Sequence, residues 1–153
     1  MIETVNTNNL GFNEAFEILQ SAFAIRKLVF VTEQDVPADE EYDEFDMPTA
    51  ARHYLAFADD MPCGTARYRQ TENGIKLERF AVLKDYRSKG VGAVILRDIL
   101  LDIDADPALE GRQIYLNAQV SAIPFYAKYG FIQVGDMFQE CDIDHYKMIF
   151  QSA

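Results

Sequence analysis

The segment Arg87-Ser88-Lys89-Gly90-Val91-Gly92 constrains this chain most, because it joins a predicted strand to a predicted helix. The strand, Ile75 to Val82, follows the hairpin signal Asn73-Gly74, and the helix, Val91 to Ile103, is almost wholly apolar. Two glycines allow a tight bend and a close approach to a ligand. The N–H groups of a first helical turn lack internal partners and lie at the positive end of the helix dipole. The segment therefore predicts an anion site, most naturally for phosphate.

The residues that follow exclude two better-known phosphate motifs. A P-loop requires Gly-Lys-Ser/Thr at the start of the helix, whereas Gly92 is followed by Ala93-Val94. A dinucleotide fingerprint requires a third small residue where this chain has Ile95. Taken alone, Arg-x-x-Gly-x-Gly is also compatible with an ordinary glycine-rich turn.

The other patterns predict one α/β domain over residues 1–153, built in layers with a mostly antiparallel sheet. Asn13 is the expected N-cap of a first helical region that ends near Gln34, with a candidate break at Ser21. A short helix is predicted from Ala122 to Tyr129, where Gly130 ends it. The predicted strands are residues 2–7, 53–58, 63–70, 75–82, 113–119, 131–138 and 146–151.

Charge and composition argue against several classes of function. The net charge of -11 disfavours nucleic acid and anionic membranes, which both attract cationic faces. No apolar run approaches the roughly 20 residues of a membrane span, and the first residues do not resemble a signal peptide. Cys63 and Cys141 form neither a disulfide framework nor a metal-ligand set. We therefore expect a cytoplasmic protein without a metal.

The negative charge is concentrated in residues 33–46, which contain eight acids and no base. The rest of the chain has 17 acids against 14 bases, so this segment supplies most of the net charge. A dense negative field attracts and steers cationic ligands, such as an amine. The alternative is a solvated acidic loop without a ligand.

Two motifs in this order of elements resemble the GNAT superfamily of acyl-CoA N-acyltransferases. They are Arg87-x-x-Gly90-x-Gly92 after the fourth strand and Pro124-Phe-Tyr-Ala-Lys-Tyr-Gly-Phe131 after the fifth. The resemblance covers nearly the whole chain and implies a mixed sheet of about seven strands that splays between strands 4 and 5, with flanking helices. Further residues resemble the ElaA-type branch, namely Val29-Phe30-Val31-x-Glu33-Gln34, Arg52-His53, Arg67, Arg79, Ala118-Gln119 and Glu140…His145…Met148.

The resemblance implies an N-acetyltransferase that uses acetyl-CoA and no metal. A primary amine of a small molecule or peptide would attack the thioester directly in a ternary complex. The alternatives are a longer acyl donor, or a non-catalytic acyl-CoA sensor or interaction module with the same fold. Pairing of the last strands across a sheet edge could form a homodimer.

The resemblance also implies the contacts to acetyl-CoA. The backbone of Arg87, Ser88, Lys89, Gly90, Val91 and Gly92 would hold the pyrophosphate. The backbone of Phe80, Ala81 and Val82, near a bulge, would pair with the pantetheine arm. Further candidate contacts are Asn117, Phe125 and Lys128.

Tyr126 matches the tyrosine that the family commonly uses as general acid, since a phenol is protonated at neutral pH. The attacking amine must lose a proton, and Glu78 on the fourth strand is the first candidate base. Glu33, His53 and His145 are further candidates for the base or the acceptor site, and a water chain is another route. Arg67 and Arg79 are expected either to bind an acceptor carboxylate or to pair with Glu78 and nearby acids.

Overall fold

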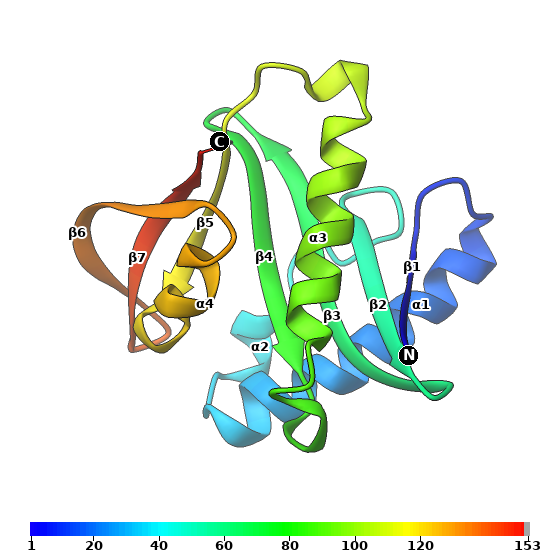
Figure 1. Cartoon of the computed structure of the whole chain (residues 1–153). Helices are drawn as coiled ribbons and strands as arrows, with labels where there is room; N and C mark the ends of the chain where they lie inside the picture. The colour runs from blue at the N-terminus through cyan, green and yellow to red at the C-terminus, as the bar shows by residue number, and fades with distance from the viewer. Residues whose placement is uncertain (152–153) are drawn as a thin grey trace.

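Seven strands form one mixed sheet through the centre of the molecule, in the order β1-β2-β3-β4-β5-β7-β6 (Figure 1). The structure is a computed structural model, and it describes residues 1–151. Neighbouring strands are antiparallel except β4 and β5, which are parallel, so the predicted mostly antiparallel sheet is confirmed. The strands are β1 (Ile2–Asn6), β2 (Arg52–Ala58), β3 (Met61–Thr71), β4 (Gly74–Val82), β5 (Ile114–Gln119), β6 (Phe131–Glu140) and β7 (Ile143–Phe150).

Helices cover both faces of this sheet. In Figure 1, α3 lies in front of the sheet and α1 behind it. The helices are α1 (Phe12–Arg26), which continues into a π-helical segment (Lys27–Glu33), α2 (Ala38–Glu41), α3 (Val91–Asp104) and α4 (Ile123–Ala127). Short 3₁₀ turns occupy Lys84–Tyr86, Pro107–Leu109 and Val120–Ala122. No helix among residues 1–151 is long and apolar enough to cross a membrane.

Two apolar cores hold these layers together. The larger core packs Ile95, Leu96 and Ile99 of α3 against the sheet, where Tyr54 is among its partners. The smaller core, on the opposite face, joins residues of α1 and the π-helical segment to Leu55 of β2. Because successive side chains of a strand point to opposite faces, β2 is buried on both sides.

The parallel pair β4 and β5 separates after a short contact, as predicted. Residues 75–77 of β4 pair with residues 114–116 of β5, and beyond Leu77 the two strands diverge toward the lower edge of Figure 1. A register shift between β3 and β4 accompanies the separation, and Arg79 there has a φ of 60°. The second half of β4 therefore has no strand partner on its β5 side.

Three local predictions were wrong. α1 runs unbroken through Ser21, because burial of Leu19, Ala22 and Ile25 outweighs the weak helix preference of serine. The N-cap of α1 is Gly11 and not Asn13. The strands β6 and β7 are longer than predicted, because a tight turn at residues 141–142 joins them where a polar link was expected.

Candidate active site

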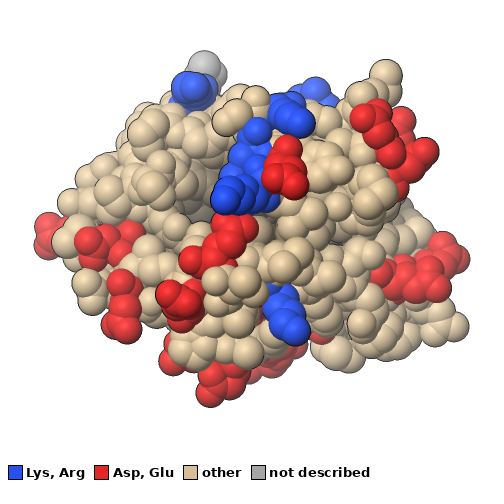
Figure 2. Space-filling view, turned by 90° about the horizontal axis from the view of Figure 1, so that it is seen from below, with Lys and Arg blue, Asp and Glu red and all other residues tan. Residues whose placement is uncertain are grey.

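A cavity of about 420 Å³ occupies the gap between the diverging strands β4 and β5. One wall is β4 from Lys76 to Val82, and the other is β5 from Leu116 to Gln119 together with Tyr126 of α4. The π-helical segment, α2 and the β6–β7 turn complete the lining. Seen from below the view of Figure 1, the surface is hollowed, and basic and acidic side chains border the hollow (Figure 2).

The turn before α3 leaves backbone N–H groups free for an anion. Gly90, the N-cap residue, has a φ of 86°, and no side chain caps the helix. A Cβ atom on Gly90 would meet nothing within 4 Å, so the space above it is open. Gly92 lies against the ring of Phe125, 3.3 Å from the position a Cβ would take. The first turn of α3 therefore fits a phosphate or diphosphate.

The charged side chains near this turn are placed differently from one another. Arg87 Nη2 lies 2.8 Å from Glu33 Oε2, and Arg87 Nε donates to the carbonyl of Val82 at 2.9 Å. The ammonium of Lys89 lies 5.7 Å from the centroid of the Tyr86 ring. The structure thus brings together Arg87, which was expected at the pyrophosphate, and Glu33, which was a candidate for the base or the acceptor site. Lys128 is exposed and does not line the cavity.

The unpaired half of β4 borders the cavity with its backbone. Ala81 is buried in the smaller core, whereas Phe80 and Val82 are half-buried against the larger one. The ring of Phe80 meets the ring of Tyr126 edge-on, with centroids 5.6 Å apart. Backbone N–H and C=O groups from Phe80 to Val82 can therefore pair with an extended ligand in the cavity.

Tyr126 lines the cavity from the first turn of α4. Its ring packs against Phe80, Phe125 and Phe131, with centroid distances of 5.6, 5.1 and 5.9 Å. Burial raises the pKa of this phenol, because a low-polarity environment disfavours the phenolate. Tyr126 therefore stays protonated at neutral pH and has a proton to donate.

Glu78 lines the cavity but is surrounded by cations. Its Oε2 atom lies 2.7 Å from Arg67 Nη2 and 2.8 Å from Arg69 Nε, and Oε1 lies 3.3 Å from Lys76 Nζ. Burial on its own would raise the pKa of Glu78, but these cations outweigh it and lower the pKa to about 2. A carboxylate held in this way is a weak proton acceptor at neutral pH.

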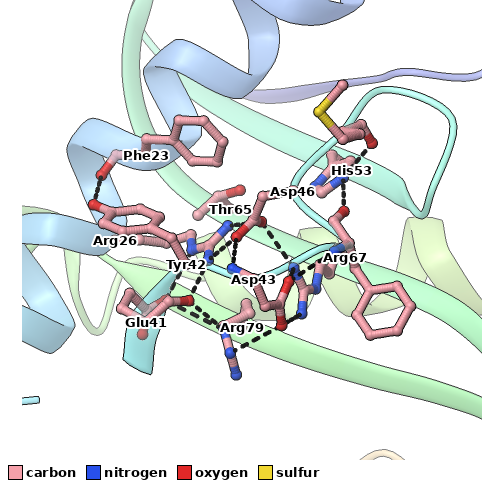
Figure 3. Close-up of polar contacts among 12 residues, drawn as sticks. Phe23, Arg26, Glu41, Tyr42, Asp43, Asp46, His53, Thr65, Arg67 and Arg79 are labelled. Carbon is pink, nitrogen blue, oxygen red and sulfur yellow. Dashed lines mark hydrogen bonds and ion pairs between the residues drawn. The ribbon is translucent and has the colours of Figure 1, made fainter. Parts of the chain in front are cut away.

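Arg67, which pairs with Glu78, also belongs to a buried ionic network with Asp43, Asp46, Arg26 and Glu41 (Figure 3). Arg67 is 1% exposed, and its Nη1 and Nη2 atoms lie 2.8 Å from Asp46 Oδ1 and Asp43 Oδ2. The same Asp46 Oδ1 lies 2.6 Å from Nη1 of Arg26, whose Nε lies 2.9 Å from Glu41 Oε1. This network joins α1, α2, the loop after α2, β3 and β4.

The network changes the meaning of the acidic segment. Three of its eight acids neutralise buried arginines. The segment is therefore held to α1 and β3 by ion pairs and is not a freely solvated loop. Arg79 adds two ion pairs to the acidic segment at the cavity edge. Its Nε lies 3.3 Å from Glu41 Oε1, and its Nη2 lies 3.4 Å from Asp43 Oδ2. Of the two arginines considered for the acceptor, Arg79 lines the cavity and Arg67 does not.

His53 lies outside the cavity, against the loop that follows α2. It is 2% exposed, and its Nε2 atom lies 3.1 Å from the carbonyl oxygen of Phe45 and 3.2 Å from that of Met47. Burial, reinforced by Arg67, lowers the pKa of His53 to about 4. The neutral imidazole therefore anchors the loop after α2 to β2.

The buried His53 predicts a specific pH dependence of stability. Its pKa is 6.5 when unperturbed and about 4 in the folded chain, so unfolding takes up a proton between these values. The free energy of unfolding therefore falls as the pH drops from 6.5 toward 4. Between pH 6.5 and about pH 5 this contributes a loss of about 2 kcal/mol. We expect His53→Gln, which keeps an N–H donor, to lack this loss in urea unfolding; an equal loss in both proteins contradicts the assignment.

His145 lies in the β5–β7 wall of the cavity. Its Nδ1 atom is 2.6 Å from the carbonyl oxygen of Ile143, and its Nε2 atom is 3.8 Å from Glu140 Oε2. The amide of Asn117 donates to Glu140 Oε1 at 3.1 Å. The ring of His145 stacks on Phe138 with centroids 5.9 Å apart. Asn117 and His145 are therefore brought together, as candidate residues of one wall.

Sequence reasoning missed several cavity residues on the acceptor side. Cys141 Sγ donates to Glu40 Oε2 at 3.3 Å, which joins the β6–β7 turn to α2 across the cavity. Gln119 Nε2 donates to Gln34 Oε1 at 2.8 Å and makes a second bridge. No local pattern predicts these contacts, because their partners are 101 and 85 residues apart. Among residues 1–151 no cluster of His, Cys, Asp and Glu is arranged to hold a metal ion.

Comparison with known proteins gives consistent matches. A family model described as "Acetyltransferase (GNAT) domain" matches residues 26–152. The "Uncharacterized N-acetyltransferase YjcF" of Bacillus subtilis is 40% identical over 134 residues, which cover 87% of this chain and 92% of that protein. The crystal structure of Escherichia coli ElaA superposes with a TM-score of 0.81 at 26% identity, covering 99% of this chain and 100% of ElaA. A GNAT family acetyltransferase from Elizabethkingia anophelis, solved with acetyl-CoA bound, has the same fold, with a TM-score of 0.59, 15% identity and coverage of 97% and 94%.

Proposed function

Because this chain belongs to the GNAT acetyltransferase family, we propose that it transfers an acetyl group from acetyl-CoA to a primary amine of a small molecule or peptide. The observation that carries the proposal is one continuous path along the open edge of β4. It runs from Val82 and Arg87, which precede the turn at Gly90, to the buried phenol of Tyr126. Such a path fits a ligand with an anionic end, an extended amide-containing arm and a reactive end.

The residues along this path fit acetyl-CoA in that order. The first-turn N–H groups of α3 hold the diphosphate, since no side chain caps this helix and the space above Gly90 is open. The backbone from Phe80 to Val82 pairs with the amides of the pantetheine arm, as an added strand pairs with a sheet edge. Acetyl-CoA supplies the activated acetyl group at the inner end of the path.

At the inner end, Tyr126 acts as the general acid. When the thioester carbon–sulfur bond breaks, the leaving sulfur needs a proton, and the phenol of Tyr126 donates it. The raised pKa of Tyr126 keeps the proton in place until that moment. The surrounding rings of Phe80, Phe125 and Phe131 exclude water from the reacting groups.

The wall formed by α2 and the β6–β7 turn supports an amine as the acceptor. Glu40 and Glu140 line the cavity there, and no arginine or lysine lies within ion-pair distance of either in residues 1–151. Glu78, by contrast, is neutralised by three cations. These two carboxylates, which no arginine or lysine of residues 1–151 neutralises, attract an ammonium group, which is the form of a primary amine at neutral pH.

Gly90→Glu tests the donor half of this proposal. The added carboxylate faces the diphosphate, so we expect acetyl-CoA affinity to fall at least about tenfold in calorimetric titrations. Gly111→Glu is the matched control, because Gly111 also has a positive φ (78°), open space around it and no place in the cavity. Equal affinity of the two variants, or no binding of acetyl-CoA by the parent protein, would contradict the proposal. Release of free thiol with a panel of amines tests the acceptor half.

A further inference from the structure

His145 is the one histidine of the two in the chain that lines the cavity. It stands on β7, which joins β5 in the wall opposite β4, and it shares the cavity with Tyr126. The amine must lose a proton before it attacks, and the groups considered so far for this step lie in very different environments. The contacts of each one decide which can accept that proton.

Three of the candidate carboxylates are each ion-paired with arginine or lysine, namely Glu78, Glu41 and Glu33. Glu78 is ion-paired with Arg67, Arg69 and Lys76, so a proton binds to it poorly at neutral pH. Burial raises the pKa of Glu41, but its Oε1 atom is held by two arginines, 2.9 Å from Arg26 Nε and 3.3 Å from Arg79 Nε. Glu33 is paired with Arg87 at the other end of the cavity.

The thiol and the phenol in the cavity cannot serve either. Burial raises the pKa of Cys141, and Glu40 beside it raises the pKa further, so this group is a protonated thiol at neutral pH. The phenol of Tyr126 is likewise protonated and is needed as the acid.

The hydrogen bond at Nδ1 determines which nitrogen of His145 can act as a base. A carbonyl oxygen only accepts, so the Nδ1 atom, 2.6 Å from the carbonyl of Ile143, must carry the hydrogen. In the neutral ring the lone pair is then on Nε2. Stacking on Phe138 holds the ring plane in this orientation.

Glu140 lies beside Nε2 of His145, and Asn117 orients Glu140. Glu140 Oε2 lies 3.8 Å from Nε2, and the other carboxylate oxygen accepts from the Asn117 amide at 3.1 Å. A carboxylate at this distance stabilises the imidazolium that forms when Nε2 accepts a proton. The arrangement is a base, a charge-stabilising partner and a residue that orients the partner.

We propose that Nε2 of His145 is the general base that accepts the proton of the acceptor ammonium, with Glu140 as its positioning residue. This inference rests on the proposed acetyl transfer. The ammonium transfers one proton to Nε2, and the nitrogen lone pair forms the bond to the acetyl carbon. The carbon–sulfur bond breaks, the sulfur takes the proton of Tyr126, and the attached nitrogen gives up its second proton, which restores the phenol through solvent. The imidazolium releases its proton to solvent, so one proton is released per acetyl group transferred.

The acceptor itself supplies a sharp test, because an amine that is already neutral does not need the base. We expect His145→Gln to lower kcat/KM for a simple alkylamine about 100-fold at neutral pH. We expect the deficit to shrink as the pH rises toward the pKa of the amine, and the acid limb of the pH profile to be lost. For a weakly basic amine such as methoxyamine, the deficit should stay below about threefold.

Glu140→Gln separates positioning from structure. The carboxamide can still accept from Asn117, so we expect kcat/KM for the alkylamine to fall several-fold while kcat/KM for methoxyamine changes less than about threefold. The pH profiles of kcat/KM are compared between proteins that keep the other ionisable groups of the cavity. These groups are Glu40, Glu41, Lys76, Glu78, Arg79, Arg87, Tyr126 and Cys141. The control is Asp144→Asn, next to His145 on β7, whose side chain bonds to Gln139 and does not line the cavity.

Three outcomes distinguish this inference from the function on which it rests. Acetyl-CoA affinity unchanged in His145→Gln, with an alkylamine-specific loss of turnover, supports the base. A His145→Gln enzyme with the parent's pH profile, or with equal losses for both amines, overturns it while acetyl transfer stands. If the parent protein binds no acetyl-CoA or releases no thiol with any amine, the proposed function fails and the inference fails with it.

Discussion

Tyr126→Phe is expected to lower kcat roughly a thousandfold while acetyl-CoA affinity stays unchanged. The substitution removes only the hydroxyl, and the ring contacts with Phe80, Phe125 and Phe131 remain, so the cavity keeps its shape. Without the phenol, the leaving sulfur departs as a thiolate that takes its proton from water. Steady-state thiol release measures kcat, and calorimetry measures the affinity for acetyl-CoA.

The matched control for this prediction is Tyr129→Phe. Tyr129 lies three residues further along, packs against Phe125 with a centroid distance of 5.3 Å and does not line the cavity between β4 and β5. We expect this variant to keep the parent's kcat. If Tyr126→Phe also keeps the parent's kcat, Tyr126 is not the general acid.

Arg67→Met is expected to lower the free energy of unfolding by about 3–5 kcal/mol. The substitution keeps most of the side-chain volume but leaves Asp43, Asp46 and Glu78 without their shared buried cation. Burial of a charge without its partner costs more than the pair contributes when it is intact. For a chain of this length the loss corresponds to a decrease in Tm of roughly 6–20 °C.

Arg97→Met provides the control, because the side chain of Arg97 is 62% exposed and pairs with Asp98 on the surface of α3. An exposed pair of this kind contributes at most about 1 kcal/mol. Chemical unfolding of both variants at neutral pH gives the comparison. Equal losses in the two variants would mean that the ionic network does not hold the acidic segment to the sheet.

Local patterns were sufficient for most of the fold. The apolar stretch from Val91 predicts α3, and Asn73-Gly74 predicts the hairpin between β3 and β4, since both signals act over a few residues. The break at Ser21 was predicted wrongly because the packing of α1 against β2 and β3, which no local pattern contains, outweighs local preference. The splaying of β4 and β5 followed from the family resemblance and is confirmed.

Some residues of the candidate site can be recognised from local motifs, whereas the environment of others depends on the fold. Gly90 and Tyr126 belong to contiguous motifs; the structure puts Gly90 at the start of α3 and Tyr126 in the cavity wall, and their roles stay predictions. The environments of Glu78, His53 and His145 could not be predicted from the sequence, because the residues that contact them come from other elements. Nothing in the sequence around Glu78 indicates that it is a weak base. That property comes from Arg67 and Arg69, which lie beside it only in the folded chain.

The sequence by itself determined the family, the order of the elements and the glycine turn before α3, because these depend on spacing along the chain and on backbone freedom at glycine. Only the tertiary structure decided what the acidic segment does. Its negative charge suggested a field for a cationic ligand, yet Glu41, Asp43 and Asp46 are used internally against Arg26 and Arg67. The physical reason is that the effect of a charge depends on its burial and on its nearest opposite charge, and both are set by segments that meet only after folding.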